Sequence, residues 1–114
     1  MLISVIIPTC NRLNLLRKCV QSIVTQIFFQ ELTDKVEVIV ADDSSNRETE
    51  VYIKSISHTF VSYVKGPEKG PAANRNNAAI QSSGEWLVFI DDDCIPDDKL
   101  LNFTLLVYLA AAGI

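Results

Sequence analysis

The chain has 114 residues, 48% hydrophobic and 21% charged, which predicts one globular domain over residues 1–114 rather than a disordered segment. Fourteen acidic residues against ten basic ones give a formal net charge of −4, which argues against a nucleic-acid partner. The three cysteines contain no CxxC pair, so we expect a reducing, cytoplasmic compartment rather than a disulfide scaffold. No apolar stretch reaches the roughly 20 residues that span a bilayer.

The first predicted strand and helix lie before residue 30. Residues 2–7 are apolar and rich in β-branched side chains, and Pro8 ends the run, as expected of a short buried strand. A polar turn follows, in which Asn11 or Asn14 could cap the next helix. The apolar residues of that helix fall on one face: Leu16, Val20, Ile23 and Ile27.

Two further strands follow, with a helix between them. Residues 36–41 predict a strand that runs into the acidic pair at 42–43, and residues 47–57 predict a helix. Residues 59–64 predict the third strand. The segment 66–71 is rich in Gly and Pro and therefore predicts a loop.

A third helix is expected over residues 72–82. Pro71 suits the first turn of this helix, and Gly84 is expected to end it. Its small side chains predict close packing against the sheet: Ala72, Ala73, Ala78 and Ala79.

The alternation of strands and helices continues to the end of the chain. Residues 86–90 predict the fourth strand, 91–98 an acidic turn and 100–112 a final helix. This order predicts an α/β fold, in which a mostly parallel sheet carries helices on both faces. The continuous apolar runs of the strands agree with burial on both sides.

Polar groups follow each predicted strand, where open α/β sheets bind their ligands. They lie at Thr9, Asp42–Asp43, Lys65–Gly66 and Asp91–Asp93. Because the carboxyl ends of parallel strands meet at one edge, we expect these groups to form one site.

The acidic turn carries the sharpest chemical signal. Three adjacent carboxylates at 91–93 repel one another, and a divalent cation or a basic partner relieves that repulsion. Carboxylate oxygens suit Mg²⁺ or Mn²⁺, and alternate residues such as Asp91 and Asp93 can point the same way. The simpler alternative is a solvated turn, in which Asp97 and Asp98 favour the start of the final helix.

Two other segments give weaker signals. One carboxylate of Asp42–Asp43 could accept hydrogen bonds from a base or ribose, or the pair could only form a turn and a helix cap. Arg75 lies in the first turns of a helix, where phosphate binds, or it could pair with a nearby Asp.

Several other kinds of site lack their motifs. The sequence has no GxGxxG after the first strand and no GxxxxGK[ST], so neither a dinucleotide fold nor a P-loop is supported. His58 is the only histidine, and it precedes a strand away from the expected site. We expect an ordinary surface residue there, which leaves no Ser/His/Asp or Cys/His set. Cys10 and Cys94 lie near the site edge, where we expect them to fill space.

Four segments resemble motifs of family 2 glycosyltransferases. They are residues 3–12 (ISVIIPTCNR), 36–45 (VEVIVADDSS), 70–76 (GPAANRN) and 84–93 (GEWLVFIDDD). Their order and spacing match the family over roughly residues 3–98. The resemblance implies a GT-A, Rossmann-like fold and a nucleotide-sugar donor, commonly UDP-linked, bound with Mg²⁺ or Mn²⁺. It further implies inverting transfer of the sugar to an acceptor hydroxyl.

The resemblance also implies residue roles. Thr9 and Asp43 would contact the nucleobase, and Arg75 would lie near the base and the diphosphate. Asp92 would approach the ribose or diphosphate. Asp93 would bind the metal, with Asp91 completing the D-x-D pair.

The sequence departs from the family pattern in residue type and in length. Cys10 stands where an aromatic residue is usual, Ser44 where Gly is usual, and Asn74 where Ala is commoner. The family's acceptor site and catalytic base follow the D-x-D motif, and no residue here matches that base. The chain is therefore expected to be the donor-binding half, truncated after the D-x-D motif.

The apolar final helix adds an expectation about association. Residues 100–112 leave almost no polar face, so an isolated chain is expected to self-associate through them. Membrane association of a longer form is the weaker alternative, because the helix lacks a basic face.

Three functions compete. The first is the donor-binding part of an inverting glycosyltransferase. The second is an inactive or truncated module that binds nucleotide sugar without transfer. The third is a receiver-type signalling domain with Asp42 and Asp43 in an acidic pocket, which the acidic triplet fits poorly.

Overall fold

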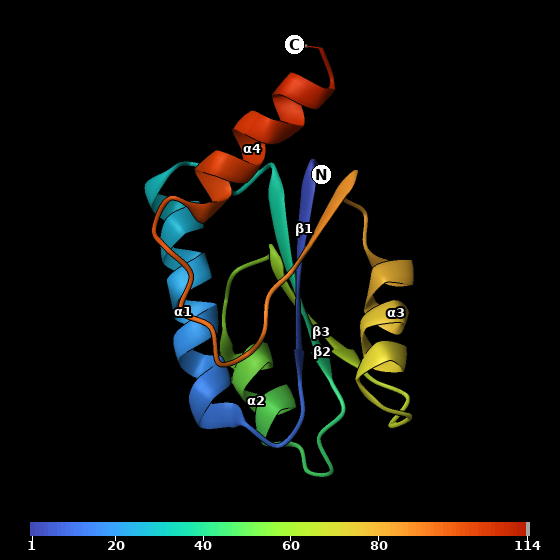
Figure 1. Cartoon of the computed structure of the whole chain (residues 1–114). Coiled ribbons are helices and arrows are strands. Elements are labelled where there is room, and N and C mark those ends of the chain that lie inside the picture. Colours follow the sequence, from blue (N-terminus) through green and yellow to red (C-terminus); the bar gives the residue numbers. More distant parts are fainter. Residues whose placement is uncertain (114) are drawn as a thin grey trace.

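The computed structural model describes residues 1–113 and confirms the α/β fold (Figure 1). The elements are β1 (Ile3–Thr9), α1 (Leu13–Phe29), β2 (Val36–Asp42), α2 (Glu48–Ser55), β3 (Val61–Lys65), α3 (Pro71–Gln81), β4 (Trp86–Phe89) and α4 (Leu100–Ala111). All pairings in the four-stranded sheet are parallel, and the strand order is β3-β2-β1-β4. Each predicted strand and helix exists, and the predicted ends lie within two residues of the observed ones.

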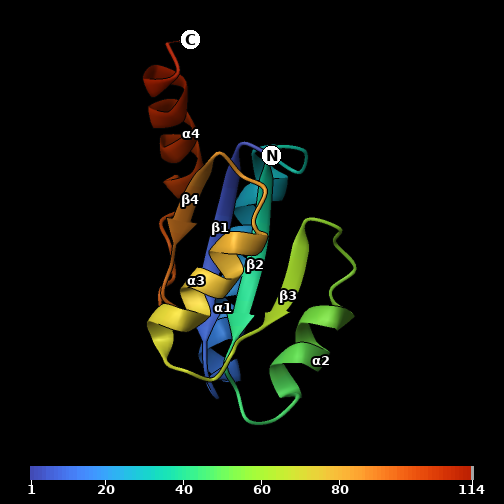
Figure 2. The ribbon, with the colours of Figure 1, turned by 90° about the vertical axis from the view of Figure 1, so that its right-hand side faces the viewer.

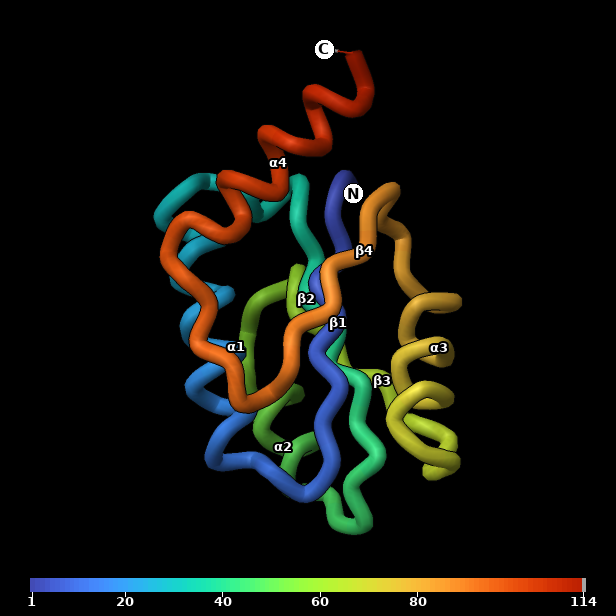
Figure 3. The backbone as a smooth tube through the Cα atoms, in the orientation of Figure 1, coloured from blue at the N-terminus to red at the C-terminus, as the bar shows by residue number. Residues whose placement is uncertain are grey.

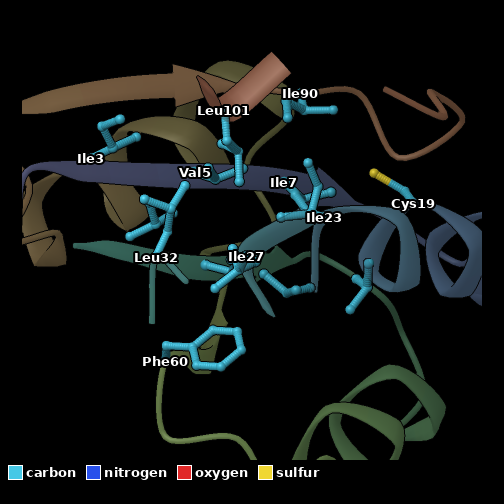
Figure 4. Packing of buried hydrophobic residues seen from close by; sticks show 14 of the residues in the cluster. Ile3, Val5, Ile7, Cys19, Ile23, Ile27, Leu32, Phe60, Ile90 and Leu101 are labelled. Atoms are coloured by element: carbon cyan, nitrogen blue, oxygen red, sulfur yellow. The ribbon is translucent and has the colours of Figure 1, made fainter. Parts of the chain in front are cut away.

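Helices cover both faces of the sheet, as the apolar strands predicted. α1 and α2 lie on one face and α3 on the other (Figures 1 and 2). The larger core joins α1 to β1 and β2, and Leu101 at the start of α4 inserts into it (Figure 4). The smaller core, on the α3 side, is Ile6, Ile39, Ala41 and Ala78. The small side chain of Ala78, fully buried, allows the close helix–sheet approach that the alanines predicted.

The sheet grows in two directions from β1. The chain adds β2 and then β3 on one side of β1. It then crosses back as α3, over the face opposite α1 and α2, and places β4 on the other side of β1. Ligands of open α/β sheets bind where the order reverses, outside the carboxyl ends of the strands. The site is therefore expected between the ends of β1 and β4.

Two predicted helix signals have other roles in the structure. Arg12 occupies the N-cap position of α1 and no side chain caps that end, while Asn14 lies inside the helix. Asn11, with a φ of 54°, instead binds the loop after β2: its backbone N–H donates to Ser44 Oγ, and its Oδ1 accepts from the backbone N–H of Ser45.

The second correction concerns Gly84, which does not end α3. That helix ends at Gln81 with Ser82 in an extended conformation. Gly84 instead lies against β1, where its backbone N–H donates to Ser4 Oγ at 2.8 Å. A Cβ on Gly84 would lie 2.5 Å from the backbone nitrogen of Ser4. The glycine is therefore needed for close packing of two backbones.

The segment after β4 runs back along α1 before α4 begins (Figure 3). Two side chains of α1 and that of its C-cap residue, spaced four residues apart, donate to its carbonyls: Ser22 to Pro96, Gln26 to Asp97 and Gln30 to Asp98. Buried Gln26 also accepts from the backbone N–H of Leu101. These contacts fix the path of the chain that leaves the acidic turn, and the apolar periodicity of α1 does not predict them.

α4 projects beyond the sheet and is only partly covered (Figure 2). Leu101 and Tyr108 are buried, and Tyr108 packs edge-on against Trp86. Phe103 and Leu106 are 66% and 57% exposed, so the apolar surface expected of this helix is present. Among residues 1–113, no helix has both the length and the apolar character needed to cross a membrane.

A hydrogen-bonded carboxylate joins the amino ends of the strands. Glu37 Oε2 accepts from Ser4 Oγ and from both the backbone N–H and the hydroxyl of Ser83. Partial burial raises the pKa of Glu37, but these hydrogen bonds outweigh that effect and hold the pKa below 4.5. The carboxylate therefore stabilises the fold above pH 4.5, and this contribution is lost as the pH falls through the folded-state pKa.

We expect Glu37→Gln to lower stability at pH 7 and to flatten the acid dependence. Urea unfolding from pH 7 to pH 3 measures both effects, with the exposed Glu31→Gln as the control. An acid dependence as steep in Glu37→Gln as in the wild type would contradict the assignment.

Candidate functional site

A pocket of about 520 Å³ lies at the carboxyl edge of the sheet. It is lined by Pro8, Thr9, Cys10, Arg12, Asp43, Glu68, Gly70, Pro71, Asn74, Arg75, Asp91, Asp92 and Asp93. The structure thus brings together the six residues to which the family resemblance gave roles, whereas Asp42, Lys65 and Gly66, which were expected at the same site, do not line the pocket. It also places those six residues where the strand order reverses.

Asp92 is a buried carboxylate with both oxygens engaged. Its side chain is 5% exposed; Oδ2 accepts from Thr9 Oγ1 at 2.8 Å, and Oδ1 lies 3.3 Å from Arg12 Nη1. A buried carboxylate requires such partners, because desolvation otherwise disfavours its charge. Asp92 and Thr9 therefore join the end of β1 to the acidic turn after β4.

Arg12 was not among the residues that the sequence put forward. Its guanidinium bridges two carboxylates, with Nη2 lying 3.4 Å from Asp93 Oδ2. The sequence signal that could have identified Arg12 is a basic residue in the turn after the first strand. That turn lies at the same edge of the sheet as the three adjacent carboxylates. Only the folded chain shows that these charges meet.

Asp91 and Asp93 are exposed at the pocket, on either side of buried Asp92. Within residues 1–113, no three His, Cys, Asp or Glu side chains are arranged to hold an ion by themselves. Mg²⁺ and Mn²⁺ accept one or two carboxylates when a diphosphate and water complete the coordination. The donor set thus fits an open metal site, in which water or a ligand fills the remaining positions, rather than a closed protein cage.

The adjacent aspartates after β2 have different roles. Asp42 is fully buried; it accepts from the backbone N–H of Ser44 at 2.9 Å and from Tyr63 Oη at 2.7 Å. Burial, followed by this hydrogen bond, raises the pKa of Tyr63. Asp43 lines the pocket and accepts from the backbone N–H of Glu68 at 2.9 Å. The helix-cap alternative is wrong for both, because Asn46 accepts from the first N–H of α2.

The N-terminus of α3 also meets the pocket. Gly70, with a φ of 103°, precedes Pro71 at the first helical position, and Arg75 lies one turn later. Arg75 forms no ion pair with any residue in the described range 1–113, so the pairing alternative finds no support there. Free N–H groups at a helix start and a guanidinium together suit an anionic ligand.

Asn74, which departs from the family pattern, is buried beside this wall. Its amide donates to the carbonyl of Ala41 at 2.9 Å, while its Oδ1 has no hydrogen-bond partner among the described residues. Gly66 explains the arrangement, because a Cβ there would lie within 2.4 Å of Asn74 Oδ1 and within 2.0 Å of Asp43 Oδ1. The backbone of Gly66 thus fits closely beside both side chains.

The cysteines and the histidine differ in burial and in what they contact. Cys19 is buried, and burial is the main cause that raises the pKa of its thiol to about 12, so it is a poor nucleophile. Cys10 is exposed at the pocket. His58 is only half-buried: its ring stacks on Phe60 at 5.3 Å and meets the edge of Phe28, so the expectation of an ordinary surface residue is corrected.

Comparison with known proteins identifies the family. The model of "Glycosyl transferase family 2" matches residues 4–105. A relative from Campylobacter jejuni, GalNAc(5)-diNAcBac-PP-undecaprenol beta-1,3-glucosyltransferase, is 35% identical over 97% of this chain and 34% of its own length. The chain thus spans about a third of that relative.

Solved structures agree with this assignment. S. aureus TarS in complex with UDP has a TM-score of 0.79 and 27% identity, covering 93% of this chain and 31% of that one. Mannosyltransferase PcManGT from Pyrobaculum calidifontis, in complex with GDP-Man and Mn²⁺, has a TM-score of 0.78 and 26% identity, covering 95% and 32%. The chain has a GT-A fold with the acidic turn where the strand order reverses, and the family model matches most of its length. The chain therefore belongs to glycosyltransferase family 2.

Proposed function

We propose that residues 1–114 are the donor-binding half of an inverting glycosyltransferase, which binds a UDP-linked sugar together with Mg²⁺ or Mn²⁺. The observation that carries the proposal is the pocket itself, which Asp43, Arg75 and the acidic turn line together. One cavity thus offers an acceptor for a base, a positive region for phosphate and carboxylates for a metal.

The charges of the pocket suit a nucleoside diphosphate. The start of α3 and Arg75 favour the phosphates. Asp91 and Asp93 would hold a metal, whose charge would relieve their mutual repulsion. A bound metal supplies charge stabilisation for the leaving diphosphate. Asp43, whose position the backbone of Glu68 fixes, is proposed to accept from the base.

Thr9 at the end of β1 and Asp92 in the acidic turn after β4 are proposed to contact the same ligand. Thr9 lines the pocket but directs its hydroxyl to Asp92, so we propose that Thr9 contacts the base through its remaining surface. Asp92 is mostly buried, and without ligand it holds the acidic turn in position through Arg12 and Thr9. When the donor binds, the proposed contact of Asp92 is the ribose.

The choice of UDP rests on similarity. TarS is described in complex with UDP and with UDP-GlcNAc, at 27% and 26% identity, whereas PcManGT is described with GDP-Man. We propose the uridine donor, and the guanosine donor is the competing outcome.

We expect binding with little or no transfer from this chain alone. No residue of this chain matches the family's base, which would activate an acceptor hydroxyl, and the compared relatives are about three times as long. The alternative is a module that binds nucleotide sugar without turnover even in its longest form.

Calorimetric titration with UDP, with and without Mn²⁺, tests the proposal. We expect UDP to bind and Mn²⁺ to tighten that binding, with GDP weaker than UDP. A folded chain that binds neither nucleotide would refute the donor-site function, while tighter binding of GDP would overturn the uridine assignment.

The exposed face of α4 leads to a prediction about association. Phe103 and Leu106 are exposed on the projecting helix, and burying such surface is favourable, so we expect concentration-dependent self-association. Sedimentation velocity at increasing concentration should show it, and Phe103→Lys with Leu106→Lys should abolish it. A monodisperse wild-type monomer at high concentration would contradict this prediction.

A further inference from the structure

The acidic turn is already neutralised in part by the protein. Arg12 places Nη1 3.3 Å from Asp92 Oδ1 and Nη2 3.4 Å from Asp93 Oδ2. The two carboxylates differ in environment, because the side chain of Asp92 is 5% exposed and that of Asp93 is 55% exposed. One guanidinium therefore holds a buried anion with one nitrogen and an accessible anion with the other.

The buried contact is the firmer of the two. Asp92 also accepts from Thr9, so loss of its Arg12 contact would leave a buried charge with a single partner. Asp93 stays largely in water, where an ion pair contributes little. Arg12 is thus anchored through Asp92, and its contact with Asp93 is the one that can open.

We propose that Arg12 is a positioning residue that competes with the divalent cation for Asp93. Without metal, the guanidinium occupies Asp93; when Mg²⁺ or Mn²⁺ binds, Asp93 passes to the cation and Arg12 remains on Asp92. The acidic turn then keeps its position in both states. This inference rests on the proposed metal-dependent donor site, and it deepens that proposal by naming the residue that governs entry of the metal.

A double variant isolates the competition. Arg12→Gln with Asp92→Asn removes the guanidinium together with the buried carboxylate that it compensates. Three carboxylates and one guanidinium carry a net charge of −2 in the wild type, and the two remaining carboxylates carry the same charge in the variant. The general attraction for a cation is therefore matched, and the freedom of Asp93 is the main difference.

We expect the double variant to bind Mn²⁺ about two- to fivefold more tightly than the wild type. This factor corresponds to the free energy that an exposed ion pair contributes, which the cation no longer has to overcome. Electron paramagnetic resonance of free Mn²⁺, without nucleotide, measures this affinity. The matched control removes the exposed pair Lys35–Asp34, before β2 and so at the opposite edge, by Lys35→Gln with Asp34→Asn, and should change nothing. Equal, weaker or absent Mn²⁺ binding by the double variant would overturn the proposal.

A second test uses the wild-type chain and therefore does not depend on whether the double variant folds. In a Mg²⁺ titration followed by nuclear magnetic resonance, the side-chain Nε–H signal of Arg12 should move with the same midpoint as the backbone amide of Asp93. The Nε–H signal of Arg47, which pairs with Glu50 on α2, should stay unchanged. An Arg12 signal that does not respond would overturn the proposal. Both readouts use metal alone, so they test the metal site on which this inference rests separately from the nucleotide. Loss of UDP binding with an intact metal response would refute the donor function but not the competition between Arg12 and the cation.

Discussion

Replacing Asp93 by asparagine is expected to remove the metal-dependent part of UDP binding. Asp93 is exposed at the pocket, and among residues 1–113 its one ion pair is the weak contact with Arg12, so a cation can reach it by displacing that contact. The amide oxygen of asparagine carries no charge and is a weaker metal ligand. Residues that only support metal ligands contribute roughly 10- to 100-fold to metal affinity, so we expect loss of a ligand to lower it about tenfold or more. Calorimetry with UDP and Mn²⁺ should show at least this loss.

Asp98→Asn provides the control for that experiment. Asp98 is an exposed aspartate of the same acidic segment that does not line the pocket. It carries the same change of charge, so it should leave the metal effect intact. Equal losses in both variants would mean that general electrostatics, rather than a ligand at residue 93, explains the metal dependence.

Gly84→Ala is expected to produce the largest loss of stability. The new Cβ would lie 2.5 Å from the nitrogen and 2.5 Å from the hydroxyl oxygen of Ser4, and 2.8 Å from the carbonyl carbon of Ile3. β1 is an interior strand of the sheet and is buried over Ile3–Ile7, so it cannot move away easily. Overpacking of this kind costs about 3 kcal/mol. Urea unfolding measured by circular dichroism should show it.

Gly113→Ala separates crowding from backbone strain. Gly113 has a φ of 76°, and a Cβ there would meet no atom of the described residues within 4 Å. We expect a cost of about 1 kcal/mol or less there, because only the left-handed conformation is penalised. A Gly84→Ala effect no larger than this would mean that β1 and the chain before β4 separate readily.

The architecture of the sheet followed from local patterns. β-branched runs ended by Pro8 or by aspartates mark strands, and helical periodicity marks α1, so strand–helix alternation alone predicted the parallel sheet. Since parallel strands end at one edge, the sequence also predicted that Thr9, Asp43 and the acidic turn would meet. The roles of these residues remain predictions that the titrations above test.

Side-chain direction at the strand ends was decided only by the tertiary structure. Asp42 and Asp43 look alike in the sequence, yet Asp42 binds Tyr63 in the interior and Asp43 faces the pocket. The middle carboxylate of the acidic turn is likewise the buried one, held by Arg12. These outcomes depend on where the chain turns and what packs beside it, which involves partners about 20 to 80 residues away.

The sequence by itself thus determined the fold class, the family and the edge of the sheet that carries the site. These depend on local periodicity and on motifs of a few residues. The tertiary structure decided which carboxylates are free, where Arg12 lies and why Gly66 and Gly84 are glycines. These properties arise from contacts between distant segments, and local patterns carry no information about such contacts.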